Sequence, residues 1–195
     1  MMTNEEFVDL ACPHSWFLVA DDLHDQAVQL RQSFGRGHLS YLDHRSGARS
    51  AWDNTNRSTF LLASFALENA IKAFLVYENP GWISNGKLSK LLRSHKLTEL
   101  ASKSVNIPYK TKGWGILRAF EEGSESWARY PCALSKENSS LPSTLDEGLW
   151  EKYEWLMASY GRRLTKLLSM HWKGPHGFKG IYEFKGRFLG ASAQA

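Results

Sequence analysis

Apolar residues recur at spacings of three and four in the first part of the chain, between Ser15 and Phe34. They are Phe17, Leu18, Ala20, Leu23, Ala27, Leu30 and Phe34. Positions with this spacing share one face of a helix, so the segment predicts an amphipathic helix that starts after Pro13. Glycines at 35 and 37 end it, and the polar stretch 43–49 predicts a loop.

Residues 50–78 contain neither proline nor glycine, and their centre, 60–76, is apolar nearly all round. A helix that is apolar on every side belongs in the middle of a bundle rather than on its surface. Pro80 and Gly81 stop this helix, because a proline disfavours the helical conformation in the residue before it. The pattern therefore predicts a long central helix over 50–78.

The next two helices are predicted from recurring apolar positions. One covers 87–103, with a break near Ser94 and His95, and the other covers 114–127. The polar segment 132–143, which also contains a proline, predicts a loop.

A fifth helix is predicted to run to about residue 171. Thr144, followed three residues later by Glu147, has the spacing of a capping box at its start. Five helical segments with no convincing strand before the tail predict an all-α, up-and-down bundle of four to five helices over residues 1–171.

Residues 172–195 differ in composition, with five glycines and a Phe-Lys-Gly triplet at 178–180 and again at 184–186. This Gly/Lys-rich tail fits a short hairpin or ordered arm, and equally a disordered tail, so both interpretations stay open. We expect its lysines, among them Lys179 and Lys185, to add phosphate contacts near a site that binds nucleic acid.

The overall composition is that of a globular chain, since 43% of the 195 residues are hydrophobic and 23% are charged. Eight tryptophans require a substantial core or a contact surface. The formal net charge of +4 is compatible with binding to nucleic acid, but the charges are spread along the chain rather than gathered in one block.

Cys12 and Cys132 lie far apart, with no CxxC pair and no Cys/His cluster at zinc spacing, so we expect two free thiols. The first residues lack the basic start and apolar run of a signal peptide, and no apolar run approaches the roughly 20 residues of a membrane span. These features predict a cytoplasmic protein without a membrane partner.

Polar residues in the central helix form a stripe on an otherwise apolar rod. Arg57, Ser64, Glu68 and Lys72 fall within roughly an 80° arc at 100° per residue. Glu68 and Lys72 stand at i and i+4 in the favourable order for an ion pair. Two interpretations stay open, a pair that fixes helix packing and a pair that belongs to a functional site.

His95 stands just before an apolar helical pattern, where it can cap the helix or act as an acid or base near neutral pH. Arg129 precedes Tyr130 and Pro131 at the end of the fourth predicted helix. It can interact with the helix dipole, or its guanidinium can face a phosphate or a carboxylate such as Glu68. Further candidate contacts with nucleic acid are Arg57, Asn69 and Arg93.

Three segments in this order, 67–75, 94–100 and 128–131, resemble the HEPN superfamily (higher eukaryotes and prokaryotes nucleotide-binding), and the resemblance covers about residues 14–171. It implies a bundle of four or five helices that is usually a homodimer. Many members are metal-independent endoribonucleases of toxin–antitoxin, phage-defence or RNA-processing systems. Others are inactive partners of nucleotidyltransferases, or RNA-binding modules. An antitoxin or a nucleotidyltransferase is therefore an expected partner.

The ribonuclease members carry an arginine, four to six residues, then a histidine, and this chain departs from that pattern. Arg162 and Arg163 precede His171 by intervals that are too long, and the only formal match is Arg31 with His38, across two glycines. The chain also lacks a Walker P-loop, a GxSxG and an HExxH motif, so we expect no cofactor and no metal.

Two hypotheses follow. In the first, a HEPN-like dimer cleaves or binds RNA, and Glu68, Lys72, His95 and Arg129 converge on one cleft, where histidine moves a proton and arginine contacts phosphate. In the second, a non-catalytic helical dimer serves as a protein-interaction or nucleotide-binding module, and exposed tryptophans mark its contact surface.

Overall fold

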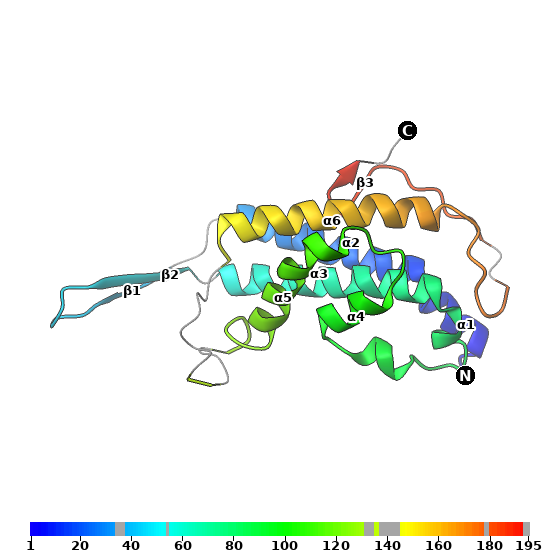
Figure 1. Ribbon diagram of the computed structural model, residues 1–195, viewed down its shortest axis with the longest axis horizontal. Coiled ribbons are helices and arrows are strands. Elements are labelled where there is room, and N and C mark those ends of the chain that lie inside the picture. The colour runs from blue at the N-terminus through cyan, green and yellow to red at the C-terminus, as the bar shows by residue number, and fades with distance from the viewer. Residues whose placement is uncertain (34–37, 54, 131–134, 137–144, 178–179, 193–195) are drawn as a thin grey trace.

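The computed structural model describes residues 1–33, 38–53, 55–130, 135–136, 145–177 and 180–192. The predicted all-α bundle is confirmed. The long helices α2 (Pro13–Gln32), α3 (Thr55–Glu78), α5 (Lys110–Ser124) and α6 (Glu147–Leu168) run in alternate directions along the molecule (Figure 1).

The central position of α3 is confirmed by its burial. Its apolar residues from Phe60 to Val76 supply much of the core, and α2 packs along it through Phe17, Ala20 and Ala27. By length and mean hydropathy, Asn56–Glu78 would suffice to cross a membrane, but 78% of its most apolar window is buried inside the bundle. That burial is typical of the core helix of a bundle.

The chain between α2 and α3 forms a β-hairpin that the sequence pattern did not indicate. Strands β1 (His38–Leu42) and β2 (Arg49–Asp53) pair antiparallel, with Leu42 opposite Arg49. The predictions of no strand before the tail and of a helix from residue 50 were therefore wrong. Asp43 closes the turn, because its carboxylate accepts the Arg45 backbone N–H and the Ser46 hydroxyl.

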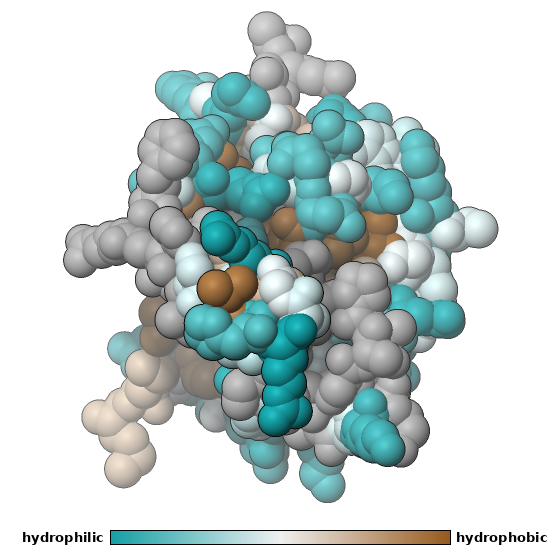
Figure 2. Space-filling view, turned by 90° about the vertical axis from the view of Figure 1, so that its left-hand side faces the viewer, coloured by the Kyte–Doolittle hydropathy of each residue, from teal (hydrophilic) through white to brown (hydrophobic). Residues whose placement is uncertain are grey.

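The hairpin projects from one end of the bundle (Figure 1). Viewed from that end, the surface is mainly hydrophilic, and apolar atoms form small separate areas (Figure 2). The hairpin side chains that are described, at 40–42 and 49–51, are all exposed. Apolar and polar residues alternate over only four positions in β1 and do not alternate in β2, which is too short a pattern to identify a strand.

The predicted helix over 87–103 is interrupted. Two short 3-10 helices, η1 (Pro80–Ile83) and η2 (Lys90–Arg93), precede α4 (Leu97–Lys103). The predicted break near Ser94 and His95 lies between η2 and α4, whereas residues 87–89 lie outside any helix.

Two helix starts also differ from the prediction. Asp146 caps α6, since its side chain accepts the Leu149 backbone N–H at 2.7 Å, and Thr144, the predicted start of a capping box, lies outside the described residues. The short helix α1 (Asn4–Leu10) was not predicted, and it begins with a capping box formed by Thr3 and Glu6.

The described part of the C-terminal segment is an arm that packs on α2 and α6 (Figure 1). It contains a small hairpin, β3 (Arg187–Phe188) with β4 (Ala191–Ser192). A Cβ at Gly161 of α6 would lie 2.6 Å from the Phe188 carbonyl oxygen, so only glycine allows this approach. The Leu189 backbone N–H donates to Asp21 of α2 at 2.7 Å.

Candidate functional site

The polar stripe of α3 is buried around an ion pair. The Lys72 Nζ lies 2.6 Å from the Glu68 Oε1, and the two side chains are only 4% and 9% exposed. The same ammonium lies 5.5 Å from the ring centroid of Trp16 in α2, within the range of a cation–π contact. Sequence analysis did not identify Trp16. Buried charges require such partners, and here each partner is supplied by a helix of the core.

His95 completes this cluster from the break between η2 and α4. Its Nδ1 lies 3.0 Å from the Glu68 Oε2 and 3.1 Å from Oε1. A carboxylate only accepts hydrogen bonds, so Nδ1 donates, and Nε2 is the ring nitrogen left to exchange a proton. Because the imidazole is 65% exposed while Glu68 is buried, the histidine is held from its inner side and open to solvent on its outer side.

Contacts at both ends of α4 fix the position of His95. At the start of the helix, the Glu121 carboxylate of α5 accepts the backbone N–H and the hydroxyl of Thr98, both at 2.8 Å. After its end, Glu78 of α3 accepts the backbone N–H of Asn106 at 2.8 Å. The segment that carries His95 is therefore tied to α3 and α5.

Arg129 is not brought to this cluster by any contact in the described ranges. It is exposed in the turn after α5, and the neighbouring Tyr130 carbonyl accepts a hydrogen bond from Arg57 near the start of α3. Arg57 precedes Glu68 by eleven residues, which is about 16 Å along a helix. Of the four predicted catalytic residues, the structure thus joins Glu68, Lys72 and His95. Pro131 lies outside the described residues.

The candidate contacts with nucleic acid are scattered. The Asn69 side chain is half-buried and donates to the Phe65 carbonyl of its own helix at 2.7 Å. Arg93 is exposed at the end of η2, close in sequence to His95. Lys185 is exposed on the arm and paired with Glu183 at 3.1 Å, and Lys179 lies outside the described residues. The hairpin of the arm packs on α6, on the opposite side of the bundle from α4 (Figure 1).

Arg31, the arginine of the formal ribonuclease match, is engaged in contacts that join three helices. Its guanidinium donates to Asn56 at 3.0 Å and to Glu147 at 2.8 Å, and it lies 5.9 Å from the Trp150 ring centroid. These contacts give Arg31 a packing role at the end of α2.

Comparisons with known proteins do not add a family. No protein-family model, curated protein or solved structure matches the chain. The likeness to HEPN domains therefore rests on the three motif segments. Within the described ranges, no three His, Cys, Asp or Glu side chains gather as ligands for a metal ion.

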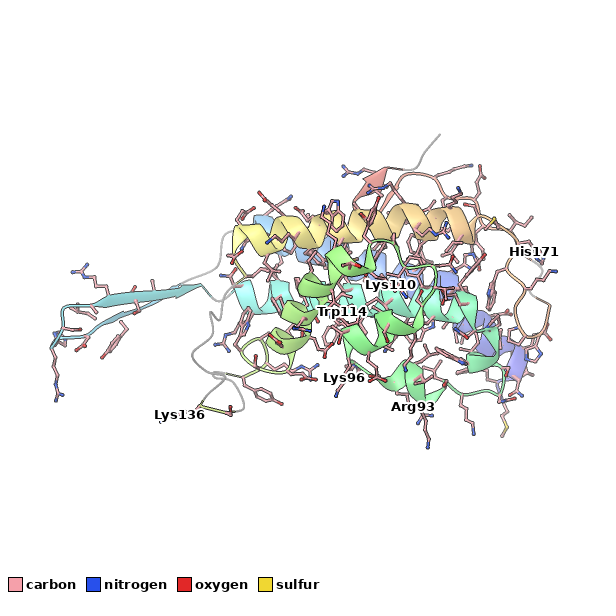
Figure 3. All side chains as sticks on the ribbon, in the orientation of Figure 1. Arg93, Lys96, Lys110, Trp114, Lys136 and His171 are labelled. Carbon is pink, nitrogen blue, oxygen red and sulfur yellow. The ribbon has the colours of Figure 1, made fainter. Side chains whose placement is uncertain are left out.

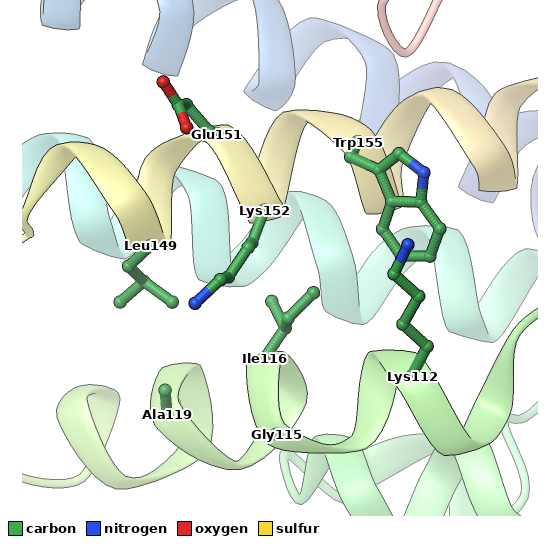
Figure 4. A pocket seen from close by; sticks show the side chains of 8 residues that line it. All are labelled: Lys112, Gly115, Ile116, Ala119, Leu149, Glu151, Lys152 and Trp155. Atoms are coloured by element: carbon green, nitrogen blue, oxygen red, sulfur yellow. The ribbon is translucent and has the colours of Figure 1, made fainter.

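A groove of about 570 Å³ lies between α5 and α6 (Figure 4). Its lining consists of Lys112, Gly115, Ile116, Ala119, Leu149, Glu151, Lys152 and Trp155. The Lys112 Nζ lies 4.2 Å from the Trp155 ring centroid. Neither Lys112 nor Lys152 forms an ion pair with a carboxylate of the described residues. The groove therefore combines an apolar floor with two lysines, and Glu151 is the acidic residue in its lining.

Proposed function

We propose that this chain is a HEPN-like protein that cleaves RNA without a metal ion, and that His95 transfers the proton. The observation that supports this proposal is the pairing of an exposed imidazole with the buried carboxylate of Glu68 at 3.0 Å. A carboxylate on Nδ1 fixes the tautomer and stabilises the imidazolium that forms when Nε2 takes a proton, as in other histidine-based sites.

The proposed reaction is a transesterification within the RNA. His95 Nε2 takes the proton of a ribose 2′-hydroxyl, the 2′-oxygen forms a bond to phosphorus, and the bond from phosphorus to the 5′-oxygen breaks. The leaving 5′-oxygen takes a proton, which the second His95 of a homodimer supplies. The products are a 2′,3′-cyclic phosphate and a 5′-hydroxyl, so no water, metal or redox partner is consumed.

The other predicted residues have supporting roles in this proposal. Glu68 orients His95, and Lys72 fixes the position of the Glu68 carboxylate through their contact at 2.6 Å. Because no contact in the described ranges joins Arg129 to His95, Arg129 contacts a different phosphate of the same RNA, toward the end of α5.

The test is cleavage of total RNA and of a defined oligonucleotide in EDTA, with detection of cyclic-phosphate ends. We expect His95→Ala to lower the rate by about a hundredfold or more, the usual size of a lost acid–base group. Glu68→Gln should lower it less, because the oxygen of the new side-chain amide can still accept from Nδ1. Arg31→Ala with His38→Ala is the control and should cleave at the wild-type rate, after a check that it folds. If the wild-type protein cleaves no RNA, the proposed function is wrong.

The groove between α5 and α6 favours a second candidate function, a module that binds an acidic amphipathic helix. Gly115 and Ala119 stand one turn apart and let a helix approach closely, and Lys112 and Lys152 are placed to meet carboxylates. An antitoxin or a nucleotidyltransferase, the partners expected from the resemblance, would supply such a helix.

This second function predicts selective binding of a designed peptide. A helical peptide of about 18 residues with leucines on one face and glutamates beside them should bind, whereas its lysine counterpart should not. Lys112→Glu with Lys152→Glu should weaken binding at least about tenfold, and Lys103→Glu with Lys166→Glu is the control with the same charge change. Equal binding of both peptides would exclude this function.

A further inference from the structure

Four cations lie at every third residue beside His95. They are Lys87, Lys90, Arg93 and Lys96, and all four are exposed. Residues 80–98 contain neither aspartate nor glutamate. We call these four residues the basic strip. Sequence analysis identified only Arg93, although the period of three is visible in the sequence.

The local backbone aligns two members of the basic strip, Lys90 and Arg93. In a 3-10 helix, residues i and i+3 eclipse each other, and three residues rise by about 6 Å. Lys90 and Arg93 of η2 therefore project from one edge. Arg93 also donates to the Leu88 carbonyl at 3.2 Å, which holds its guanidinium against the backbone next to Lys87 in the chain. Figure 3 shows Arg93 and Lys96 on the same edge of the molecule.

The charge of the basic strip is not neutralised nearby. No carboxylate of the described residues forms an ion pair with any of its four members. Lys103, on the next helix, pairs with Glu99 at 3.6 Å. Leu92 is fully buried and anchors the edge to the core, so the cations are displayed from a fixed segment.

We propose that the basic strip binds three or four consecutive phosphates of a single nucleic-acid strand and delivers the next one to His95. Lys90 and Arg93 stand about 6 Å apart along η2, a spacing close to that of neighbouring phosphates in a single strand, and Lys96 directly follows His95 in the chain. The nucleotides that contact the basic strip all lie on one side of the bond that is cleaved. The inference rests on the proposed function for the role of His95, but the binding step is independent of cleavage.

Binding is measured by fluorescence anisotropy with a labelled oligouridylate, in a His95→Ala background so that no RNA is cut. Salt is varied, because each phosphate contact on a single strand contributes about −0.7 to the slope of log affinity against log salt. Lys90→Ala, Arg93→Ala and Lys96→Ala together should make the slope about 2 less steep and raise Kd about tenfold to hundredfold at 0.1 M salt. Arg45→Ala, Lys103→Ala and Lys166→Ala together remove the same charge elsewhere and should leave the slope unchanged.

The outcomes separate this inference from the proposed function. Equal slopes for the two triple variants would overturn the basic strip even if wild-type protein cleaves RNA. A salt slope that becomes less steep only in the variant of Lys90, Arg93 and Lys96 would support the inference, even if the wild-type protein cleaves no RNA. Single-stranded DNA should bind nearly as well, since the strip contacts phosphates. Polyglutamate that binds more tightly than either nucleic acid would overturn the inference in favour of an acidic protein partner.

Discussion

At the scale of single residues, burial decides what an ion pair contributes. Glu68 with Lys72 and Glu99 with Lys103 have the same i, i+4 spacing. The first pair is buried at 2.6 Å, whereas the second is exposed to solvent at 3.6 Å. Removal of one partner leaves an uncompensated charge in the core in the first case and a hydrated charge in the second.

Lys72→Met should therefore lower the free energy of unfolding by about 3 kcal/mol, measured by urea denaturation. Glu68→Gln combined with Lys72→Met should cost less than the sum of the single changes, because neither charge is then left alone. Lys103→Met is the control in the same protein and should cost at most about 0.5 kcal/mol.

The same variants separate the two interpretations of the pair. If Lys72 serves packing alone, Lys72→Met will cleave RNA at the wild-type rate at a temperature where it is folded. A lower rate with an intact fold would show that the pair also positions His95. A cost of Lys72→Met no larger than that of Lys103→Met would contradict the argument from burial.

At the scale of elements, the sequence predicted those helices whose apolar residues are buried in the core. The central helix was recognisable because residues 50–78 lack proline and glycine and their centre is apolar nearly all round, and α2 because its apolar positions follow the period of a helix. The β1–β2 hairpin was missed because it projects from the bundle, so no core constrains its pattern. The helix α1 was missed because it has only seven residues and depends on a local capping box.

The candidate site was predictable to the same degree. The stripe on α3 followed from helix geometry alone, and the break at His95 followed from local sequence. The contact between His95 and Glu68 depends on how α4 is tied to Glu121, which is tertiary information. Arg129 was expected in the same cleft as Glu68. Its turn is linked instead to Arg57, near the start of α3. Sequence spacing alone does not indicate which end of a long helix a later turn contacts.

At the scale of the whole molecule, two buried histidines of α2 lie beneath the C-terminal arm. His14 stacks on Tyr182 of the arm at 3.8 Å, and a Cβ at Gly190 would lie 3.3 Å from the His24 Nε2. Burial lowers the pKa of His14, and it lowers the pKa of His24 to about 4. Both histidines are therefore neutral in the folded state, and the arm packs against their neutral forms.

His24 makes the stability of the fold depend on pH. Burial raises the pKa of Tyr153, so its hydroxyl stays protonated, and it shares a hydrogen bond with the His24 Nδ1 at 2.9 Å. In the unfolded chain, His24 titrates near 6.5. Between pH 6.5 and about 4 the unfolded state binds the extra proton, so stability is full above pH 6.5 and falls as the pH is lowered.

A fall in the pKa of His24 from 6.5 to about 4 corresponds to about 3 kcal/mol of stability lost by pH 4. Burial raises the pKa of Asp21, which offsets part of this loss at the acid end. Urea unfolding at pH 7.5, 5.5 and 4.5 measures the effect. His24→Gln, which stays neutral and can accept from Tyr153, should flatten the pH dependence, whereas the exposed His171→Gln should not. An unchanged pH profile in His24→Gln would show that the acid sensitivity of the fold lies elsewhere.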